Sequence, residues 1–251
     1  MCLACDDSGV SHGRGIARRS LLFAPAALAA STLAGGAFAK TGRVAKPVKA
    51  PPKPENVLSP DAALARLMEG NKRYQSGVAK RHDFVAEREA LVAGQNPFAG
   101  VLSCSDSRIV PEYAFDSGRG DLFVVRVAGN FAAPEGIASL EYAVEELKTP
   151  LLLVLGHEAC GAVKATIGAL RDDTTLPGHL PSLVEALAPA VKAAAGRPGD
   201  PLTNAIRENV RLTGEALRSA TPILSAAVAE KRVKIVGGVY RLSDGAVELL
   251  A

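Results

Sequence analysis

The sequence has no tryptophan, and aromatic residues make up only 4% of its 251 residues. A surface that stacks nucleic-acid bases needs aromatic side chains beside basic ones. Basic charge is also concentrated at one end, because residues 1–57 carry a formal net charge of +5 and residues 58–251 carry −2. The sequence therefore argues against nucleic-acid binding and favours a small-molecule substrate.

An apolar run near the N-terminus follows the pair Arg18-Arg19 and ends in small residues before Lys40. Paired arginines, a short apolar stretch and an A-x-A ending at Ala39 are typical of a twin-arginine export signal. The alternative is a short membrane anchor or a buried helix, but the run is short and rich in alanine for a membrane span. We therefore expect residues 1–39 to be a signal peptide cleaved after Ala39, and a periplasmic or secreted mature protein without a membrane span.

Cysteine is scarce, with four in the chain, and two of them, Cys2 and Cys5, would leave with the signal. The remaining pair, Cys104 and Cys160, would form a disulfide by default in an oxidising compartment. The alternative is a metal ion that binds both thiolates and keeps them from pairing. Export of a folded protein with its cofactor in place favours the metal.

The rest of the chain divides into a linker and one domain. Residues 40–57 are rich in lysine and proline and lack an apolar pattern, which is typical of a solvated linker with polyproline character. The domain, residues 58–251, opens with a helix that Ser59 caps and Gly77 ends.

Short apolar runs then alternate with helical patterns, which predicts a mainly parallel sheet. The expected strands are residues 101–103, 122–127, 151–155 and 233–239, with an edge strand at 246–250. Helices are expected at 135–148 and 159–171, and across 180–230, where Pro181, Pro189, Pro201 and Pro222 separate alanine-rich segments. The predicted fold class is α/β, with about four parallel strands and an edge strand flanked by helices and with a projecting N-terminal helix.

Two loops follow buried strands at the carboxyl edge of this sheet, where reactive groups gather in open α/β folds. The first contains Cys104, and the second contains His157 and Cys160. Zinc prefers thiolate sulfur and imidazole nitrogen in a tetrahedron, and a catalytic zinc leaves one position for water. The three side chains predict a zinc site, with the disulfide as the main alternative.

Asp106 and Arg108 follow the first of these cysteines closely. Two thiolates would lower the electrophilicity of the metal, so the site needs help to generate hydroxide. An arginine can hold a carboxylate through two parallel hydrogen bonds, and that carboxylate can accept a hydrogen bond from metal-bound water. The pair is therefore a candidate catalytic unit.

The stretches SCSDSR, FVVRVAGN, SLEYAVEELK and VLGHEACGAVKA resemble the β-carbonic anhydrase family, and the likeness runs from the helix near Ser59 to the last strands. The resemblance implies reversible hydration of carbon dioxide to bicarbonate by a zinc-bound hydroxide, one Zn²⁺ per chain, and a homodimer or dimer of dimers. It implies Asp106 and Arg108 as the catalytic pair and, as zinc ligands, Cys104, His157 and Cys160. It also implies a substrate pocket that involves Gln95 from a partner subunit together with Phe123, Ala128, Tyr142 and Gly161.

Two features depart from the family pattern. Members regulated by a second bicarbonate site carry a tryptophan three residues before the first ligand, where this chain has Val101, so we expect no such regulation although Arg126 is present. Ala128 stands where a larger aliphatic residue is common, which implies a slightly more open pocket wall.

Three further possibilities remain open from the sequence. In a closed state Asp106 would leave Arg108 and become the fourth zinc ligand. Relatives in the family hydrolyse CS₂ or COS at the same kind of site. A purely structural zinc is the third possibility, although such a site normally has four protein ligands and no polar pair beside it.

Overall fold

The computed structural model describes residues 57–80, 83–92 and 94–250. The predicted signal peptide and all of the predicted linker before Val57 lie outside the described residues, so their boundaries stay predictions. Within the described part of the chain, no helix combines the length and the apolar character that crossing a bilayer requires.

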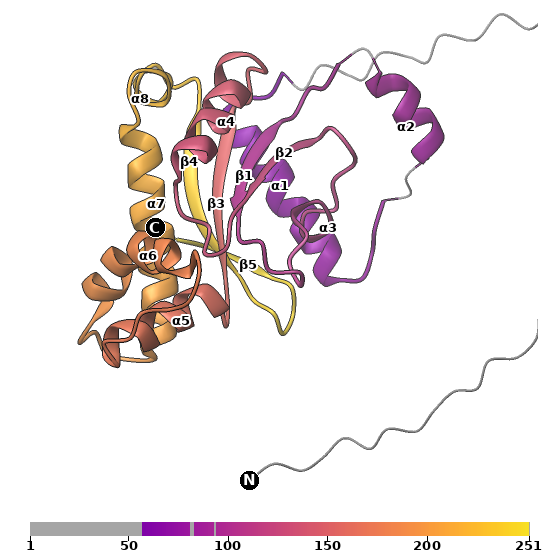
Figure 1. The fold of residues 1–251 in the computed structure, drawn as a ribbon. Coiled ribbons are helices and arrows are strands. Elements are labelled where there is room, and N and C mark those ends of the chain that lie inside the picture. The colour runs from indigo at the N-terminus through magenta and orange to yellow at the C-terminus, as the bar shows by residue number, and fades with distance from the viewer. Residues whose placement is uncertain (1–56, 81–82, 93, 251) are drawn as a thin grey trace, which may run out of the picture. The chain divides into compact units, whose positions relative to one another are not determined.

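The described residues form one five-stranded sheet. The strands are β1 Ala99–Ser103, β2 Leu122–Arg126, β3 Leu151–His157, β4 Lys234–Tyr240 and β5 Val247–Leu250. Their order across the sheet is β2-β1-β3-β4-β5 (Figure 1). The first four strands run parallel to one another, and β5 is antiparallel to β4. The predicted α/β fold class, with a mainly parallel sheet and an edge strand, is confirmed.

Eight helices accompany the sheet in the described residues. They are α1 Pro60–Gln75, α2 Phe84–Leu91, α3 Pro111–Ala114, α4 Pro134–Glu145, α5 Gly161–Arg171, α6 Leu180–Ala194, α7 Pro201–Ser219 and α8 Ile223–Ala229. The sequence patterns predict all of these regions except the short helices α2 and α3.

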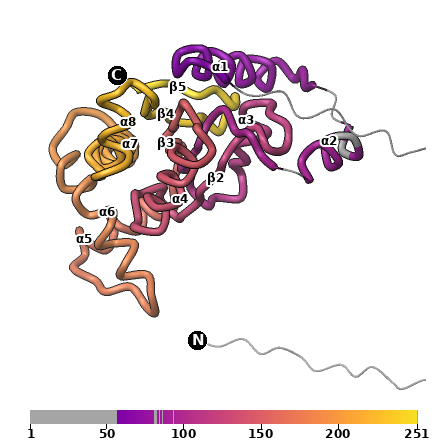
Figure 2. Tube along the Cα trace, turned by 90° about the horizontal axis from the view of Figure 1, so that it is seen from above, coloured from indigo at the N-terminus to yellow at the C-terminus, as the bar shows by residue number. Residues whose placement is uncertain are grey.

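Alternate side chains of the strands pack against two different helical layers, as the pleat of a strand requires. On one face Val101 and Leu153 belong to a buried cluster with residues of α1 and α3. On the other face Leu102 and Val154 belong to a cluster with residues of α4 to α8. Figure 2 shows α1 and α4 on opposite sides of the strands. Because helices cover both faces, β1 and β3 are buried along their whole length.

Helix α1 lies on the sheet. Ser59 caps it by accepting a hydrogen bond from the Ala62 N–H at 3.2 Å, and Gly77 follows its last turn with a φ of +72°. Both ends therefore agree with the sequence. The expected projection of this helix is wrong, because Ala63 and Leu67 are fully buried against the sheet.

Three of the four prolines expected to separate helices between residues 180 and 230 lie at helix starts. Pro181 and Pro201 lie in the first turns of α6 and α7, and Pro222 directly precedes α8. Pro189 lies inside α6, so the expectation that it separates two helices is wrong. Pro189 and Glu185 are both exposed, so water can hydrogen-bond the Glu185 carbonyl, which has no N–H donor four residues later.

The strand ends place the candidate ligands. β1 ends at Ser103, next to Cys104, and β3 continues to His157, two residues beyond the predicted end. The two strands are parallel neighbours with Ser103 opposite Leu155. Cys160 is the N-cap of α5, which begins at Gly161, slightly later than predicted.

Candidate metal centre

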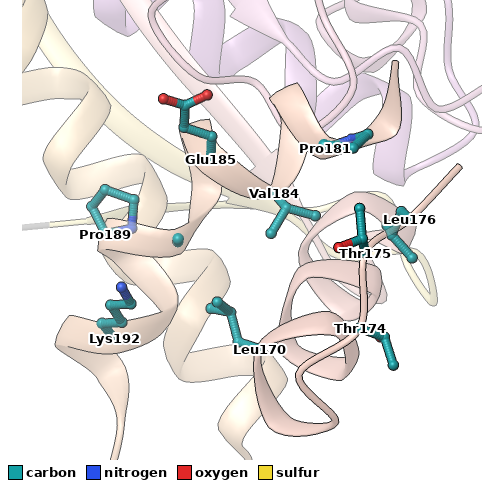
Figure 3. A pocket seen from close by; sticks show the side chains of 10 residues that line it. Leu170, Thr174, Thr175, Leu176, Pro181, Val184, Glu185, Pro189 and Lys192 are labelled. Atoms are coloured by element: carbon teal, nitrogen blue, oxygen red, sulfur yellow. The ribbon is translucent and has the colours of Figure 1, made fainter. Parts of the chain in front are cut away.

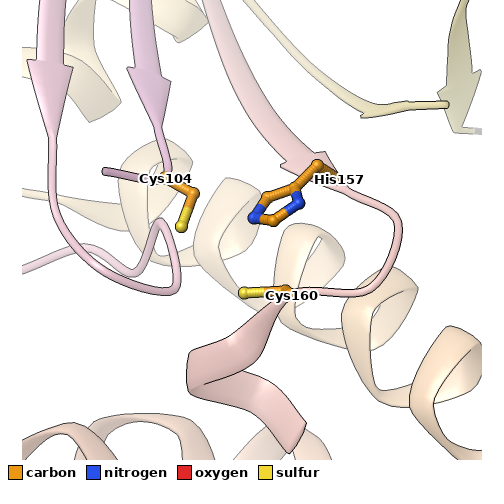
Figure 4. Close-up of side chains that lie close together, drawn as sticks. All are labelled: Cys104, His157 and Cys160. Carbon is orange, nitrogen blue, oxygen red and sulfur yellow. The ribbon is translucent and has the colours of Figure 1, made fainter. Parts of the chain in front are cut away.

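The three predicted ligands converge at the carboxyl ends of β1 and β3. Figure 4 shows the side chains of Cys104, His157 and Cys160 turned toward one another. Their ligand atoms all lie within 4.8 Å of one another, and all three residues are buried. Both cysteines are free thiols. The expected convergence is therefore confirmed, and the alternative of a disulfide is not what the structure contains.

The ring of His157 is oriented for a ligand. Its Nδ1 lies 2.8 Å from the Glu158 carbonyl oxygen, which only accepts, so Nδ1 carries the hydrogen and Nε2 presents a lone pair. This Nε2 is buried and has no hydrogen-bond partner among the residues that the structure describes. A buried nitrogen normally has a partner. Two sulfurs and a partnerless imidazole nitrogen fit a Zn²⁺ ion, which takes such donors.

The two thiols differ in their readiness to ionise. A hydrogen bond from Cys160 lowers the pKa of Cys104 to about 4, with help from the backbone N–H of Gly129 against the effect of burial. The pKa of Cys160 is raised, first because its hydrogen is shared with Cys104 and then because it is buried. A divalent cation between the sulfurs would offset their mutual repulsion and hold both as thiolates.

Asp106 and Arg108 form the expected pair beside this cluster. Arg108 Nε lies 2.9 Å from Asp106 Oδ1, and Nη2 lies 2.7 Å from Oδ2. These bonds hold the pKa of Asp106 well below its usual range. Asp106 Oδ2 is also 3.9 Å from His157 Nε2. Arg108 thus holds the Asp106 carboxylate beside the three candidate ligands.

Arg126, at the end of β2, braces the loop that carries Cys104 and Asp106. Its Nε donates to the Cys104 carbonyl at 3.0 Å, and its Nη2 donates to the carbonyls of Asp106 and Ile109 at 2.8 and 2.9 Å. The sequence gives only the presence of an arginine here. The structure shows that its guanidinium binds backbone carbonyls of this chain.

The residues expected to line the substrate pocket occupy two places. Gln95 and Tyr142 line one cavity of about 500 Å³, and the rings of Phe123 and Tyr142 are 6.3 Å apart between centroids. Ala128 and Gly161 do not line that cavity. Gly161 directly follows Cys160 at the start of α5, and Ala128 lies in the turn after β2, next to Gly129, whose N–H binds Cys104 Sγ.

Another cavity, of about 740 Å³, lies beside α5 and α6 (Figure 3). Its lining is largely apolar and includes Leu170, Val184 and Pro189. None of the predicted site residues lines it, so it has no part in the chemistry considered below.

Comparison with known proteins agrees with this geometry. The sequence model of the family described as carbonic anhydrase matches residues 99–247. Carbonic anhydrase 2 of Mycobacterium tuberculosis is 38% identical over 188 residues, covering 74% of this chain and 91% of its own. The solved structure of the β-carbonic anhydrase CcaA is 28% identical, with a TM-score of 0.57 over 75% of this chain and 95% of the other. The chain belongs to the β-carbonic anhydrase family.

Other relatives of this β-carbonic anhydrase extend the same likeness. The carbonic anhydrase of Mycolicibacterium smegmatis is 38% identical over 196 residues, covering 76% of this chain and 93% of its own. A structure from Sordaria macrospora, described as a tetrameric β-carbonic anhydrase, is 25% identical with a TM-score of 0.59, covering 73% and 91%. The family recognised from the motifs is confirmed.

Proposed function

We propose that this protein hydrates carbon dioxide reversibly to bicarbonate and a proton, with one zinc ion per chain held by Cys104, His157 and Cys160. The observation that supports the proposal is the convergence of three buried metal-binding side chains next to an arginine-held carboxylate. Membership of the β-carbonic anhydrase family supports the same reaction.

Zinc at such a site lowers the pKa of a bound water and so supplies a hydroxide nucleophile near neutral pH. The protein groups around it give orientation. Asp106 lacks a hydrogen of its own while Arg108 holds it ionised, so it can only accept a hydrogen bond. It therefore selects the orientation in which the attacking oxygen turns a lone pair toward the substrate carbon.

The substrate is placed by an apolar pocket and a few N–H donors. Phe123 and Tyr142 offer apolar surface, Ala128 leaves space, and Gln95 offers an amide. Gly161, as the first residue of α5, presents an N–H that has no partner within its helix and can bind a substrate oxygen. The apolar side chains keep water away from one side of the substrate, and the N–H donors orient its oxygens.

The test is metal analysis of the purified protein together with stopped-flow hydration of carbon dioxide. We expect one zinc per chain and rapid hydration. Parallel assays with CS₂ and COS separate carbonic anhydrase activity from the hydrolase activities of relatives. Stoichiometric zinc without turnover of any of the three substrates would contradict the proposal and favour a structural zinc.

We further propose that the protein is a homodimer or a dimer of dimers in which Gln95 serves the partner's site. β2 is an edge strand, and the nearby Tyr142 is 50% exposed, as an unpaired surface would be. Mixing Gln95→Ala chains with Asp106→Asn chains tests this directly. If Gln95 acts across the interface, each mixed dimer contains one intact site and activity returns; no recovery in demonstrated mixed dimers contradicts it.

We also propose that the enzyme is exported and cleaved after Ala39. The supporting features are the paired arginines, the short apolar run and the small residues before Lys40. Sequencing the N-terminus of the secreted protein should give Lys40 as the first residue. An intact N-terminus at Met1 in that fraction is the contrary result.

A further inference from the structure

Two consecutive hydrogen bonds connect helix α7 to the sulfur of a metal-binding cysteine. The Gly129 N–H donates to Cys104 Sγ at 3.3 Å. The Gly129 carbonyl accepts a hydrogen bond from Asn209 Nδ2 at 2.7 Å. All three residues are buried, with Asn209 only 3% exposed. The sequence gives no sign of this link, because Asn209 lies 80 residues beyond Gly129.

The position of Gly129 is constrained from two sides. Its φ of +88° is one that glycine adopts readily, and a Cβ there would lie 2.8 Å from Leu187 Cδ1 of α6. The N–H and the carbonyl belong to the two peptide groups that flank the Gly129 Cα. Glycine rotates easily about its N–Cα and Cα–C bonds. A hydrogen bond to the Gly129 carbonyl is therefore needed to keep the N–H directed at the sulfur.

We propose that Asn209 is a positioning residue of the metal centre: it fixes the turn after β2 so that the Gly129 N–H binds the Cys104 sulfur. The inference rests on the proposed metal site. An N–H bonded to a thiolate draws electron density from the sulfur, and groups outside the ligand set hold ligands in orientation. Asn209 therefore counteracts the loss of metal electrophilicity that two thiolates cause.

The ordinary alternative is that Asn209 only satisfies buried backbone groups. The chain offers a matched control in Asn71, which is 1% exposed. Its Nδ2 donates to the carbonyls of Ala114 and Gly245 at 2.9 and 2.8 Å, away from the metal-binding loops. Both asparagines donate to backbone carbonyls from a helix, but only Asn209 binds a residue, Gly129, whose own N–H donates to a ligand sulfur.

The experiment compares Asn209→Leu and Asn71→Leu in the cobalt-loaded protein. Both substitutions should lower the melting temperature. Only Asn209→Leu should move the sulfur-to-cobalt charge-transfer band to longer wavelength and weaken cobalt binding by about tenfold, the lower end of effects outside the ligand set. A band and an affinity that match those of Asn71→Leu would overturn the proposal.

A second measurement does not depend on a variant that folds. In wild-type protein loaded with ¹¹³Cd, a hydrogen bond to a ligand sulfur transmits scalar coupling from the metal to the amide hydrogen. We expect this coupling at Gly129, and its absence overturns the inference.

A wild-type protein without any sulfur-to-cobalt band refutes the metal site and the proposed function; a normal band with no effect of Asn209→Leu refutes the inference alone.

Discussion

At the scale of single residues, Asp106 is the side chain that we expect to affect catalysis strongly and folding stability hardly at all. Its side chain is 17% exposed, and its partner Arg108 is 51% exposed, so their ion pair contributes little to folding. The same carboxylate is 3.9 Å from the nitrogen that would bind the metal. We predict that Asp106→Asn lowers the rate of carbon dioxide hydration by about 100-fold and leaves thermal stability almost unchanged.

Asp244 provides the control for this prediction. Arg241 binds its two oxygens at 3.2 and 2.7 Å, which repeats the geometry of Asp106 and Arg108 at the surface. Asp244→Asn should leave hydration unchanged. Hydration by stopped flow and unfolding by circular dichroism measure the two effects. A loss of activity in Asp106→Asn that tracks a loss of folded protein would assign Asp106 a structural role.

At the scale of secondary-structure elements, one valine sets how closely α7 approaches the sheet. A Cβ on Gly156 of β3 or on Gly237 of β4 would lie 2.6 Å from a methyl group of Val210. The valine side chain therefore fits against two strands that have no side chains at these points. Overpacking of such a contact typically costs 1–3 kcal/mol.

We accordingly predict that Gly237→Ala destabilises the protein by about 2 kcal/mol. Val210→Ala removes the methyl groups that the new Cβ would meet, so the double variant should be more stable than the sum of the single effects predicts. Urea unfolding of the four proteins measures the coupling. Additive effects would show that the sheet, rather than Val210, resists the larger side chain.

The sequence predicts the elements that have a strong local pattern. β1 and β3 are apolar runs followed by the ligand residues, and their predicted ends are within two residues of the observed ones. Helix α2 has eight residues and α3 has four, too few for periodicity to distinguish them from a loop. Pro189 inside α6 contradicts local propensity because the packing of α6 outweighs one lost hydrogen bond.

The residues of the candidate site also fall into two groups, those that the sequence identifies and those that only the structure reveals. Cys104, His157 and Cys160 are identifiable because their chemistry is distinctive and they lie at or just after the ends of strands. Asn209 and Arg126 act on backbone groups that only the folded chain brings to them. Any asparagine in a helix could satisfy the same local pattern, so this contact is visible only in three dimensions.

At the scale of the whole molecule, the metal joins segments that are far apart in the sequence. Cys104 follows β1, His157 ends β3, and Cys160 caps α5. An ion that binds only the folded arrangement stabilises it by about 2.7 kcal/mol at 100 times its dissociation constant. We predict that chelation lowers the melting temperature and that zinc restores it. An unchanged melting temperature in protein shown to have lost its metal would contradict this.

Acid sensitivity should arise in part from Glu208 on α7. This side chain is 2% exposed, and it accepts hydrogen bonds from Arg211 Nε at 3.1 Å and from Arg197 Nη1 at 2.9 Å. Arg211, followed by Arg197, holds the pKa of Glu208 below its usual range despite burial. The unfolded chain therefore binds more protons as the pH falls, and the stabilisation by Glu208 decreases below the ordinary glutamate pKa of about 4.3.

We predict that Glu208→Gln is clearly less stable than wild type at pH 7 and that the difference shrinks as the pH falls through about 4, near the unfolded glutamate pKa. Urea unfolding at each pH measures the difference in the free energy of unfolding. Chelated protein is used so that metal loss in acid does not contribute. Glu215→Gln is the matched control, because Glu215 also pairs with Arg211 but is 52% exposed and should contribute little at either pH. A difference for Glu208→Gln that stays constant with pH would mean that the buried carboxyl contributes by its shape, since only a charge-dependent contribution disappears on protonation.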